Sequence, residues 1–196
     1  MTRKTKQERR RELLAAARDA FVEKGFQAAT VDDIVANADV ARGTFYLYFS
    51  DKRDVFEALV DTFLGRLDAC VKSIDLELPE TPVEQLRANI GRVVALALEE
   101  PTIVKLALHD ATGVDPELDE KLHGFYEGLR ALIDDSLDQG QALGMVRAGD
   151  RRVMVAIGLG GLKEVLVDTV AGHIERDADV ITEEIMRFLA GGLLVR

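Results

Sequence analysis

The sequence predicts an all-α fold of about nine helices, with a small N-terminal domain followed by a larger C-terminal domain. Helix-favouring residues dominate, and no stretch of alternating β-branched residues is typical of a strand. The four prolines all lie where the helical pattern of apolar residues breaks, at Pro79, Pro82, Pro101 and Pro116. Apolar residues make up 47% of the chain and charged residues 31%, a balance that predicts a globular protein with a substantial core.

The N-terminal helices are delimited by recognisable start and stop residues. Gly25 suits the C-terminal cap of the first helix, and the hydroxyl of Thr30 can cap the second. These helices are expected over residues 6–24, 31–38, 41–48 and 51–75.

The C-terminal helices begin after a connector at residues 76–82. Thr81, Pro82 and Glu84 form a good helix start, because proline suits the first helical position and the glutamate completes a capping box. The C-terminal helices are expected over residues 82–99, 101–111, 116 to 140 or 144, 150–172 and 177–191.

Charge is divided unevenly along the chain. The formal net charge is −10, yet residues 1–53 hold 11 Lys or Arg against 8 Asp or Glu, a net of +3. Residues 54–196 hold the other 14 basic and 27 acidic residues, a net of −13. Affinity for phosphate depends on local cationic density, so a basic head on an acidic body allows DNA contact at the head alone. Charge by itself is equally compatible with a solvated basic tail.

Residues 30–49 carry the most informative pattern, which is two short helices joined by a tight turn, as in a helix-turn-helix. One set of side chains has the spacing to form its core: Ile34, Val35, Val40, Phe45 and Phe49 against Leu14, Ala17 and Phe21. The remainder of the second helix must then face outward, namely Arg42, Thr44, Tyr46 and Tyr48. Arginine reads guanine edges and hydroxyls bind phosphates, so this face suits DNA, although both tyrosines also fit as helix-packing aromatics.

The same stretch resembles the signature of the tetracycline-repressor (TetR) family. The similarity is close over about residues 9–60 and is carried by the run Ala38-Asp39-Val40-Ala41-Arg42-Gly43-Thr44-Phe45-Tyr46-Leu47-Tyr48-Phe49-Ser50-Asp51-Lys52. Beyond it, the chain fits by its length, its all-helical pattern and its two final apolar helices. The resemblance implies a DNA-binding domain at residues 1–53 and a ligand-binding and dimerisation domain at residues 54–196.

The resemblance also implies which residues contact the operator: Thr30, Arg42, Thr44, Tyr46, Tyr48 and Lys52. Two positions depart from the family pattern. The turn position that usually holds glycine is Asp39, which can still adopt the left-handed conformation at modest cost. The serine or threonine usual before the recognition helix is Ala41, so one capping or phosphate-binding hydroxyl is missing.

The last two helices are expected to form a dimer interface. The helix over residues 150–172 has two apolar faces, one of them rich in glycine, and therefore needs a partner on each side. These helices resemble the family's paired helices that assemble into a four-helix bundle. The expected interface residues are Gly158, Gly161, Leu162, Val165, Ile181, Ile185 and Phe188. A core helix within one chain is the other interpretation.

A ligand pocket is expected between the helices of the larger domain, with an apolar wall and a few polar groups. The candidates are Phe63, Leu67, Cys70, His109, His123, Phe125 and Tyr126, each of which also fits as an ordinary core residue. The three histidines lack metal-ligand spacing, and we expect no metal site and no cofactor.

These observations predict a sequence-specific transcriptional regulator, a homodimeric repressor that a small, mostly apolar effector of unknown identity releases from a palindromic double-stranded operator. Control by a protein partner and an α-helical hydrolase using His109 are the alternatives. No placed nucleophile, metal cluster or nucleotide loop supports an enzyme. The longest uncharged apolar run has ten residues, Val153–Leu162, whereas a bilayer span takes about 20, so we expect no membrane contact and a cytoplasmic protein.

Overall fold

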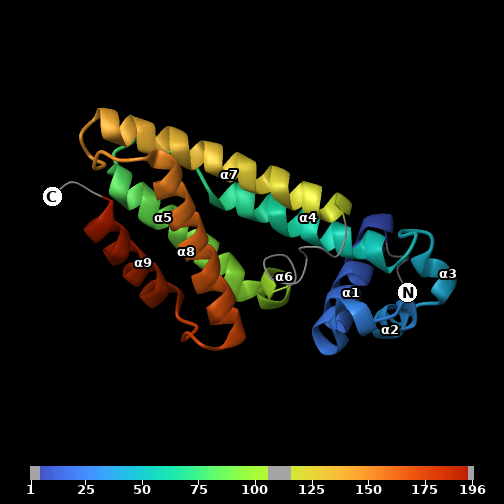
Figure 1. Ribbon diagram of the computed structural model, residues 1–196. Coiled ribbons are helices and arrows are strands. Elements are labelled where there is room, and N and C mark those ends of the chain that lie inside the picture. Colours follow the sequence, from blue (N-terminus) through green and yellow to red (C-terminus); the bar gives the residue numbers. More distant parts are fainter. Residues whose placement is uncertain (1–4, 106–115, 194–196) are drawn as a thin grey trace. The chain divides into compact units, whose positions relative to one another are not determined.

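The computed structural model describes residues 5–105 and 116–193, which form helices and no β-strand (Figure 1). The all-α prediction is confirmed for these residues. The chain divides into two compact units, Met1–Gly65 and Arg66–Arg196. The division falls within one helix, α4 (Lys52–Cys70), which therefore contributes residues to both units.

The first unit contains α1 (Lys6–Ala28), α2 (Val31–Asn37), α3 (Arg42–Phe45) and the first part of α4. Its core holds side chains from all four helices, among them Leu13, Phe21, Ile34, Phe45 and Val55, each at most 2% exposed. We expected Leu14 in this core, but Leu14 is half-buried and its neighbour Leu13 is the fully buried residue. The two are adjacent leucines, so the periodic pattern alone did not separate them.

Gly25 was expected to end the first helix, and instead it interrupts α1, which continues to Ala28. Its φ of 77° and ψ of 157° are not helical, and one more helical turn follows as far as Ala28. The turn is held by the backbone N–H of Ala29, which donates to the carbonyl of Gly25 at 3.1 Å. A positive φ is cheap for glycine and strained for other residues, which explains the break at this position.

α4 ends at Cys70, earlier than the expected end near residue 75. The amide of Asn89 explains the difference, because it donates to the carbonyl of Lys72 at 2.7 Å and accepts from the Lys72 N–H at 3.1 Å. Gln85 likewise accepts from the N–H of Asp75 at 2.8 Å. These side chains replace the helical hydrogen bonds of the segment, so it leaves the helix at little cost.

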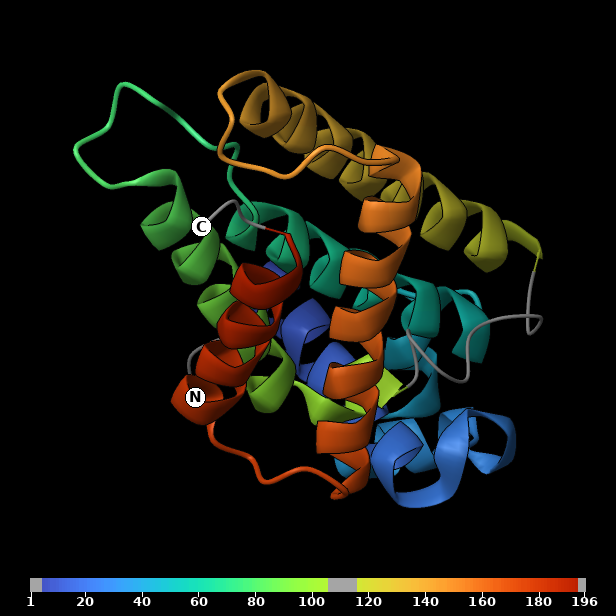
Figure 2. The same cartoon turned by 60° about the vertical axis from the view of Figure 1, so that its left-hand side comes forward.

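The second unit contains five further helices: α5 (Pro82–Glu99), α6 (Pro101–Lys105), α7 (Pro116–Ala142), α8 (Arg151–Ala171) and α9 (Ala178–Gly192). α5 packs against α9, whereas α8 packs against α7 and α6 (Figure 2). Thr81 caps α5 in the predicted capping box with Glu84, and Gly172 ends α8 in the left-handed conformation.

Ion pairs tie these helices together. Arg151 at the start of α8 reaches Asp134 at 3.2 Å and Asp138 at 2.5 Å on α7. Arg66 on α4 reaches Glu99 and Glu100 at 2.8 and 2.7 Å. Most of these side chains are partly exposed, so the pairs orient the helices more than they stabilise them.

Candidate nucleic-acid interface and ligand cavity

α2 and α3 form a helix-turn-helix within the first unit. Thr30 caps α2: its hydroxyl accepts from the N–H of Asp33 at 3.2 Å, and the Asp33 carboxylate accepts from the N–H of Thr30 at 2.9 Å. Asp39 then adopts the predicted left-handed conformation, with a φ of 49°. The N–H of Val40 donates to the carbonyl of Val35 at 3.1 Å and closes the turn. The sequence therefore builds the motif without glycine at its turn.

The Asp33 carboxylate is held by three donors. The ammonium of Lys24 donates to it at 2.7 Å, and Thr30 donates from both its hydroxyl and its backbone. The hydrogen bond from Lys24, followed by those from Thr30, lowers the pKa of Asp33 to about 2. Asp33 is therefore ionised at neutral pH and fixes the start of α2.

α3 is shorter than expected, since regular helix covers Arg42–Phe45 and turns continue to Tyr48. Ala41 makes no side-chain capping bond, as its side chain predicts. Phe45 is fully buried, whereas Tyr46 is 49% exposed. The recognition segment thus separates into a buried and an exposed face.

Arg42 is exposed at the start of α3. Its guanidinium lies 2.6 Å from the carboxylate of Asp32 and 3.4 Å from the hydroxyl of Tyr46. The hydrogen bond with Tyr46 and the charge of Asp32 raise the pKa of Arg42. A cation on the solvent side of the recognition helix is the feature that base reading requires.

The other predicted DNA contacts differ in exposure. Thr30 is exposed, whereas Thr44 and Tyr48 are half-buried. Lys52 is engaged within the unit: its ammonium donates to the carbonyls of Phe26 and Gln27 at 2.8 and 3.0 Å. A lysine has three donors, so one remains for a phosphate.

One exposed residue of this segment, Leu47, was not among the predicted DNA contacts. Leu47 follows Tyr46 and is 73% exposed. An exposed leucine beside hydroxyls and a cation suits a thymine methyl or a sugar. The signal was present in the sequence, because Leu47 lies outside the pattern that buries Phe45 and Phe49.

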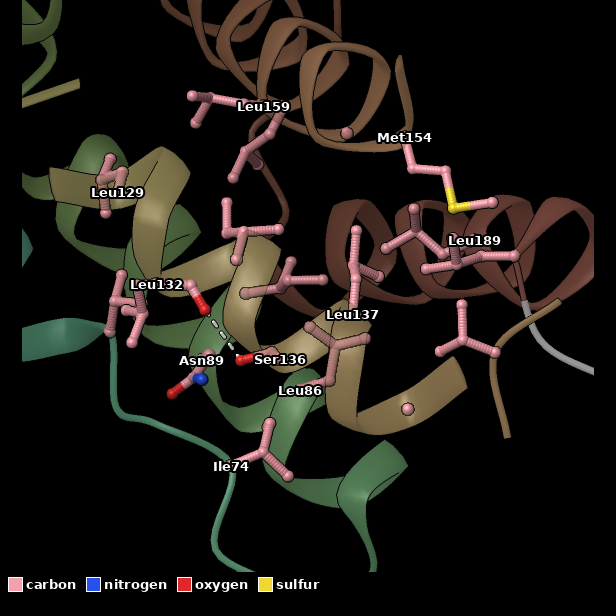
Figure 3. A pocket seen from close by; sticks show the side chains of 18 of the residues that line it. Ile74, Leu86, Asn89, Leu129, Leu132, Ser136, Leu137, Met154, Leu159 and Leu189 are labelled. Atoms are coloured by element: carbon pink, nitrogen blue, oxygen red, sulfur yellow. Dashed lines mark hydrogen bonds between the residues drawn. The ribbon is translucent and has the colours of Figure 1, made fainter. Parts of the chain in front are cut away.

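A cavity of about 460 Å³ lies within the second unit, which is ordinary for a small-molecule site. Its wall is formed by α5, α7, α8, α9, the end of α4 and the connector to α5 (Figure 3). The apolar side chains shown in Figure 3 include Ile74, Leu86, Leu129, Leu132, Leu137, Met154, Leu159 and Leu189.

The polar lining residues are few and none is acidic among those that the structure describes. Three are basic, namely Lys72, Arg147 and Lys163. The uncharged ones are Asn89, Tyr126, Ser136 and Gln139. The cavity therefore favours an apolar molecule that carries a polar or anionic group.

The predicted ligand residues fall into three groups. Leu67, Phe125 and Tyr126 line the cavity. Cys70, which is half-buried, and His123, which is exposed, are not among its lining residues, and Phe63 is a buried residue of the first unit. His109 lies outside the described residues.

The predicted interface residues also differ in exposure. Gly161 and Phe188 are exposed, Ile181 is buried within its own chain, and the others are half-buried: Gly158, Leu162, Val165 and Ile185. Gly158, Leu162, Ile185 and Phe188 also line the cavity.

Among the described residues, no group of three or more His, Cys, Asp or Glu side chains is placed to bind a metal ion. None of the described helices is long and apolar enough to cross a membrane.

The motif, its exposed arginine and the helical unit that follows define a class: a DNA-binding transcriptional regulator. Residues 13–59 match the model for bacterial regulatory proteins of the tetR family. Over these residues, the chain has the DNA-binding domain of that family.

Several proteins are similar to this chain over nearly its whole length. The fatty acid metabolism regulator protein of Bacillus subtilis is 23% identical over 193 residues, which cover 97% of this chain and 98% of the relative. FadR, a fatty acid degradation regulator from Bacillus halodurans, superimposes with a TM-score of 0.76 at 24% identity, covering 96% of each chain. FadR from Bacillus subtilis in complex with stearoyl-CoA gives 0.73 at 23% identity, covering 93% of this chain and 98% of that one. The two superpositions show that the fold is shared over nearly the whole chain.

Proposed function

We propose that this regulator is a repressor that leaves its operator when a long-chain acyl thioester fills the cavity of the second unit. The cavity carries the proposal, because it is large, apolar and lined by three basic but no acidic side chains among the described residues. An acyl chain would bury its methylenes there, at about 0.8 kcal/mol each. The phosphates of a coenzyme A group would meet the basic side chains. The named ligand of one structural neighbour, stearoyl-CoA, has this chemistry.

The DNA contacts are proposed for the exposed face of the helix-turn-helix. Arg42 would read a guanine, while Thr30 and Tyr48 would bind phosphates on either side of it. Thr44, Tyr46 and Lys52 complete the set. Residues 1–53 are proposed as the DNA-binding domain and residues 54–196 as the ligand-binding and dimerisation domain.

We also propose that the protein is a homodimer through α8 and α9. Four apolar residues on these helices are more than half exposed in one chain: Val153, Ile157, Val180 and Phe188. A Cβ added at Gly160 or Gly161 would meet nothing within 4 Å, so a second backbone can approach there. Exposed apolar surface of this kind is costly in water and marks an interface.

Selection of bound sequences from random DNA tests the first part of the proposal. A palindrome with two half-sites is expected, since each chain holds one recognition helix. Recovery of a single unrepeated site would contradict the dimeric mode of binding.

Calorimetry with stearoyl-CoA and with free coenzyme A tests the second part. The acyl chain supplies most of the burial, so coenzyme A alone should bind more than about a hundredfold more weakly. Equal affinity for the two would show that the cavity is not the site.

A further inference from the structure

One polar group of the cavity wall, the hydroxyl of Tyr126, is left without a hydrogen bond. Among the described residues, the Tyr126 hydroxyl is the side-chain group that is buried without any hydrogen-bond partner. Two other uncharged side chains of the wall already have partners. Asn89 is bonded to the backbone of Lys72, and Ser136 donates to the carbonyl of Leu132 at 2.9 Å (Figure 3).

A buried hydroxyl without a partner destabilises the folded chain, because it loses its bonds to water and gains none. Such groups are rare in folded proteins, and each therefore calls for a ligand or another partner. Burial also raises the pKa of Tyr126, so the hydroxyl keeps its proton and stays a donor.

The surroundings of Tyr126 narrow the chemistry of that partner. Tyr126 lies on α7 with its ring edge-on to Phe125 at 6.0 Å. The ammonium of Lys163, on α8, lies 5.9 Å from the centre of the Tyr126 ring, and both residues line the cavity. The protonated hydroxyl can donate, so an acceptor oxygen of a bound molecule would satisfy it.

We propose that the Tyr126 hydroxyl donates a hydrogen bond to the carbonyl oxygen at the head of a bound acyl chain. This assignment rests on the proposed function and names the polar contact that orients the ligand. The carbonyl can come from an acyl thioester or from a free fatty acid. A fatty acid carboxylate would also pair with Lys163, whereas a neutral thioester carbonyl needs the hydroxyl alone.

Two coenzyme A derivatives isolate the hydrogen bond. Palmitoyl-CoA has the carbonyl oxygen, and the thioether S-hexadecyl-CoA lacks it at the same chain length. The wild-type protein should bind palmitoyl-CoA about five- to tenfold more tightly than the thioether. Tyr126→Phe should bind palmitoyl-CoA as weakly as the thioether and leave thioether affinity unchanged.

The thermal stability of the ligand-free protein gives a second readout, in which Tyr126→Phe should be favourable although it weakens ligand binding. Tyr126→Phe removes the unpartnered hydroxyl and keeps the ring, so its Tm should rise by roughly 2–4 °C. A hydroxyl with a structural partner would instead lower the Tm when it is removed.

Ser136→Ala is the matched control, because the Ser136 hydroxyl already donates within its own helix. Its affinity for palmitoyl-CoA should stay within about twofold of wild type. The affinities of the wild-type protein separate the two sources of the carbonyl: palmitoyl-CoA should bind more tightly than palmitate if the thioester is the ligand. Palmitate that binds more tightly than palmitoyl-CoA would identify the free acid as the ligand.

Wild-type protein that binds palmitoyl-CoA and S-hexadecyl-CoA equally would overturn the assignment of Tyr126 and leave the proposed function standing. Wild-type protein that binds neither these ligands nor palmitate would overturn the proposed function itself.

Discussion

Arg42, which we propose as the base-reading side chain, is held by an ion pair in the DNA-free protein. Its ion pair with Asp32 is exposed, with 55% and 67% of the two side chains open to solvent. Exposed pairs of this kind contribute little to stability, so the guanidinium can exchange the carboxylate for a guanine edge at small cost. Asp32 therefore orients Arg42 without competing strongly with the operator.

The Arg42→Ala variant should lose discrimination at one base pair per half-site. A bidentate arginine–guanine contact discriminates by about 1–3 kcal/mol, and the other positions of the operator should keep their preferences. Binding to a panel of single-base operator variants measures this. An unchanged preference profile would remove Arg42 from base reading.

Tyr48 and Lys52 provide the contrasting case, because they lie toward the far end of the motif, where phosphates are expected. Tyr48→Phe and Lys52→Ala should weaken binding to every sequence about equally, and Lys52→Ala should reduce the salt slope by about one. Lys52→Ala should also lower the Tm, since the carbonyls of Phe26 and Gln27 lose their donor. A lower Tm with an unchanged salt slope would make Lys52 purely structural.

The Asp33 carboxylate predicts a pH dependence for the N-terminus of α2. Its pKa is lowered from the ordinary value of 3.8 to about 2, so its contribution to stability is complete above the unfolded value. That contribution falls as the pH drops from about 4 toward 2, where the folded group takes up a proton. The Tm difference between wild type and Asp33→Asn should shrink over this range. A Tm difference that stays constant down to pH 2 would mean that the ionised form of Asp33 does not stabilise the folded protein.

Residue roles were predictable from the sequence where they depend on near neighbours. The cap at Thr30, the left-handed Asp39 and the exposed Arg42 all follow from local spacing. The contact of Lys52 with Phe26 joins residues that local patterns do not connect. The unpartnered Tyr126 hydroxyl is equally invisible in sequence, because it depends on what every neighbouring helix fails to supply.

The turn between α2 and α3 places Asp39 in a backbone conformation that is unfavourable for a residue with a Cβ. Asp39 has a φ of 49°, a region that costs a residue with a Cβ roughly 1–2 kcal/mol. Asp39→Gly should therefore stabilise the protein by up to about 1 kcal/mol and raise the Tm by roughly 2–4 °C.

Ala38→Gly is its matched control one residue earlier. The backbone of Ala38 is in the right-handed region, with a φ of −82° and a ψ of −7°. Glycine relieves no strain there and only increases the entropy of the unfolded chain, so it should lower the Tm. Thermal unfolding of the two variants decides the matter. An Asp39→Gly variant that is no more stable than wild type would show that Asp39 is not strained.

Helix starts were predicted more accurately than helix ends. The beginnings of α5 and α8 follow from capping side chains that the sequence displays, Thr81 and Asp150. The predicted end of α4 was wrong because the observed end depends on Asn89 and Gln85, which lie on another helix. The cavity is enclosed by side chains from α5, α7, α8 and α9, so it depends on how these helices pack and not on any local sequence pattern.

At the scale of the whole molecule, assembly is the first property to test. Phe188→Glu and Gly161→Glu place a charge on the proposed α8–α9 interface and should yield monomers that bind the operator weakly. Val22→Glu is the control, because Val22 is 56% exposed on α1 and far along the chain from that interface. Analytical ultracentrifugation should find Val22→Glu dimeric. A dimeric Phe188→Glu protein with normal operator affinity would place the interface elsewhere.

Ligand binding and DNA binding are assigned to different units, and α4 contributes to both. Lys52 opens this helix in the first unit, and Leu67, in the second, lines the cavity. A ligand can shift the DNA-binding equilibrium only by its difference in affinity between the two states, so it must bind the DNA-free form more tightly.

The most direct measurement is the anisotropy of a fluorescent palindromic operator, bound by the wild-type protein and titrated with stearoyl-CoA. The anisotropy should fall to the value of free DNA, with free coenzyme A at the same concentrations leaving the complex intact. Operator that stays fully bound at saturating stearoyl-CoA would contradict the central claim that an acyl thioester controls this regulator.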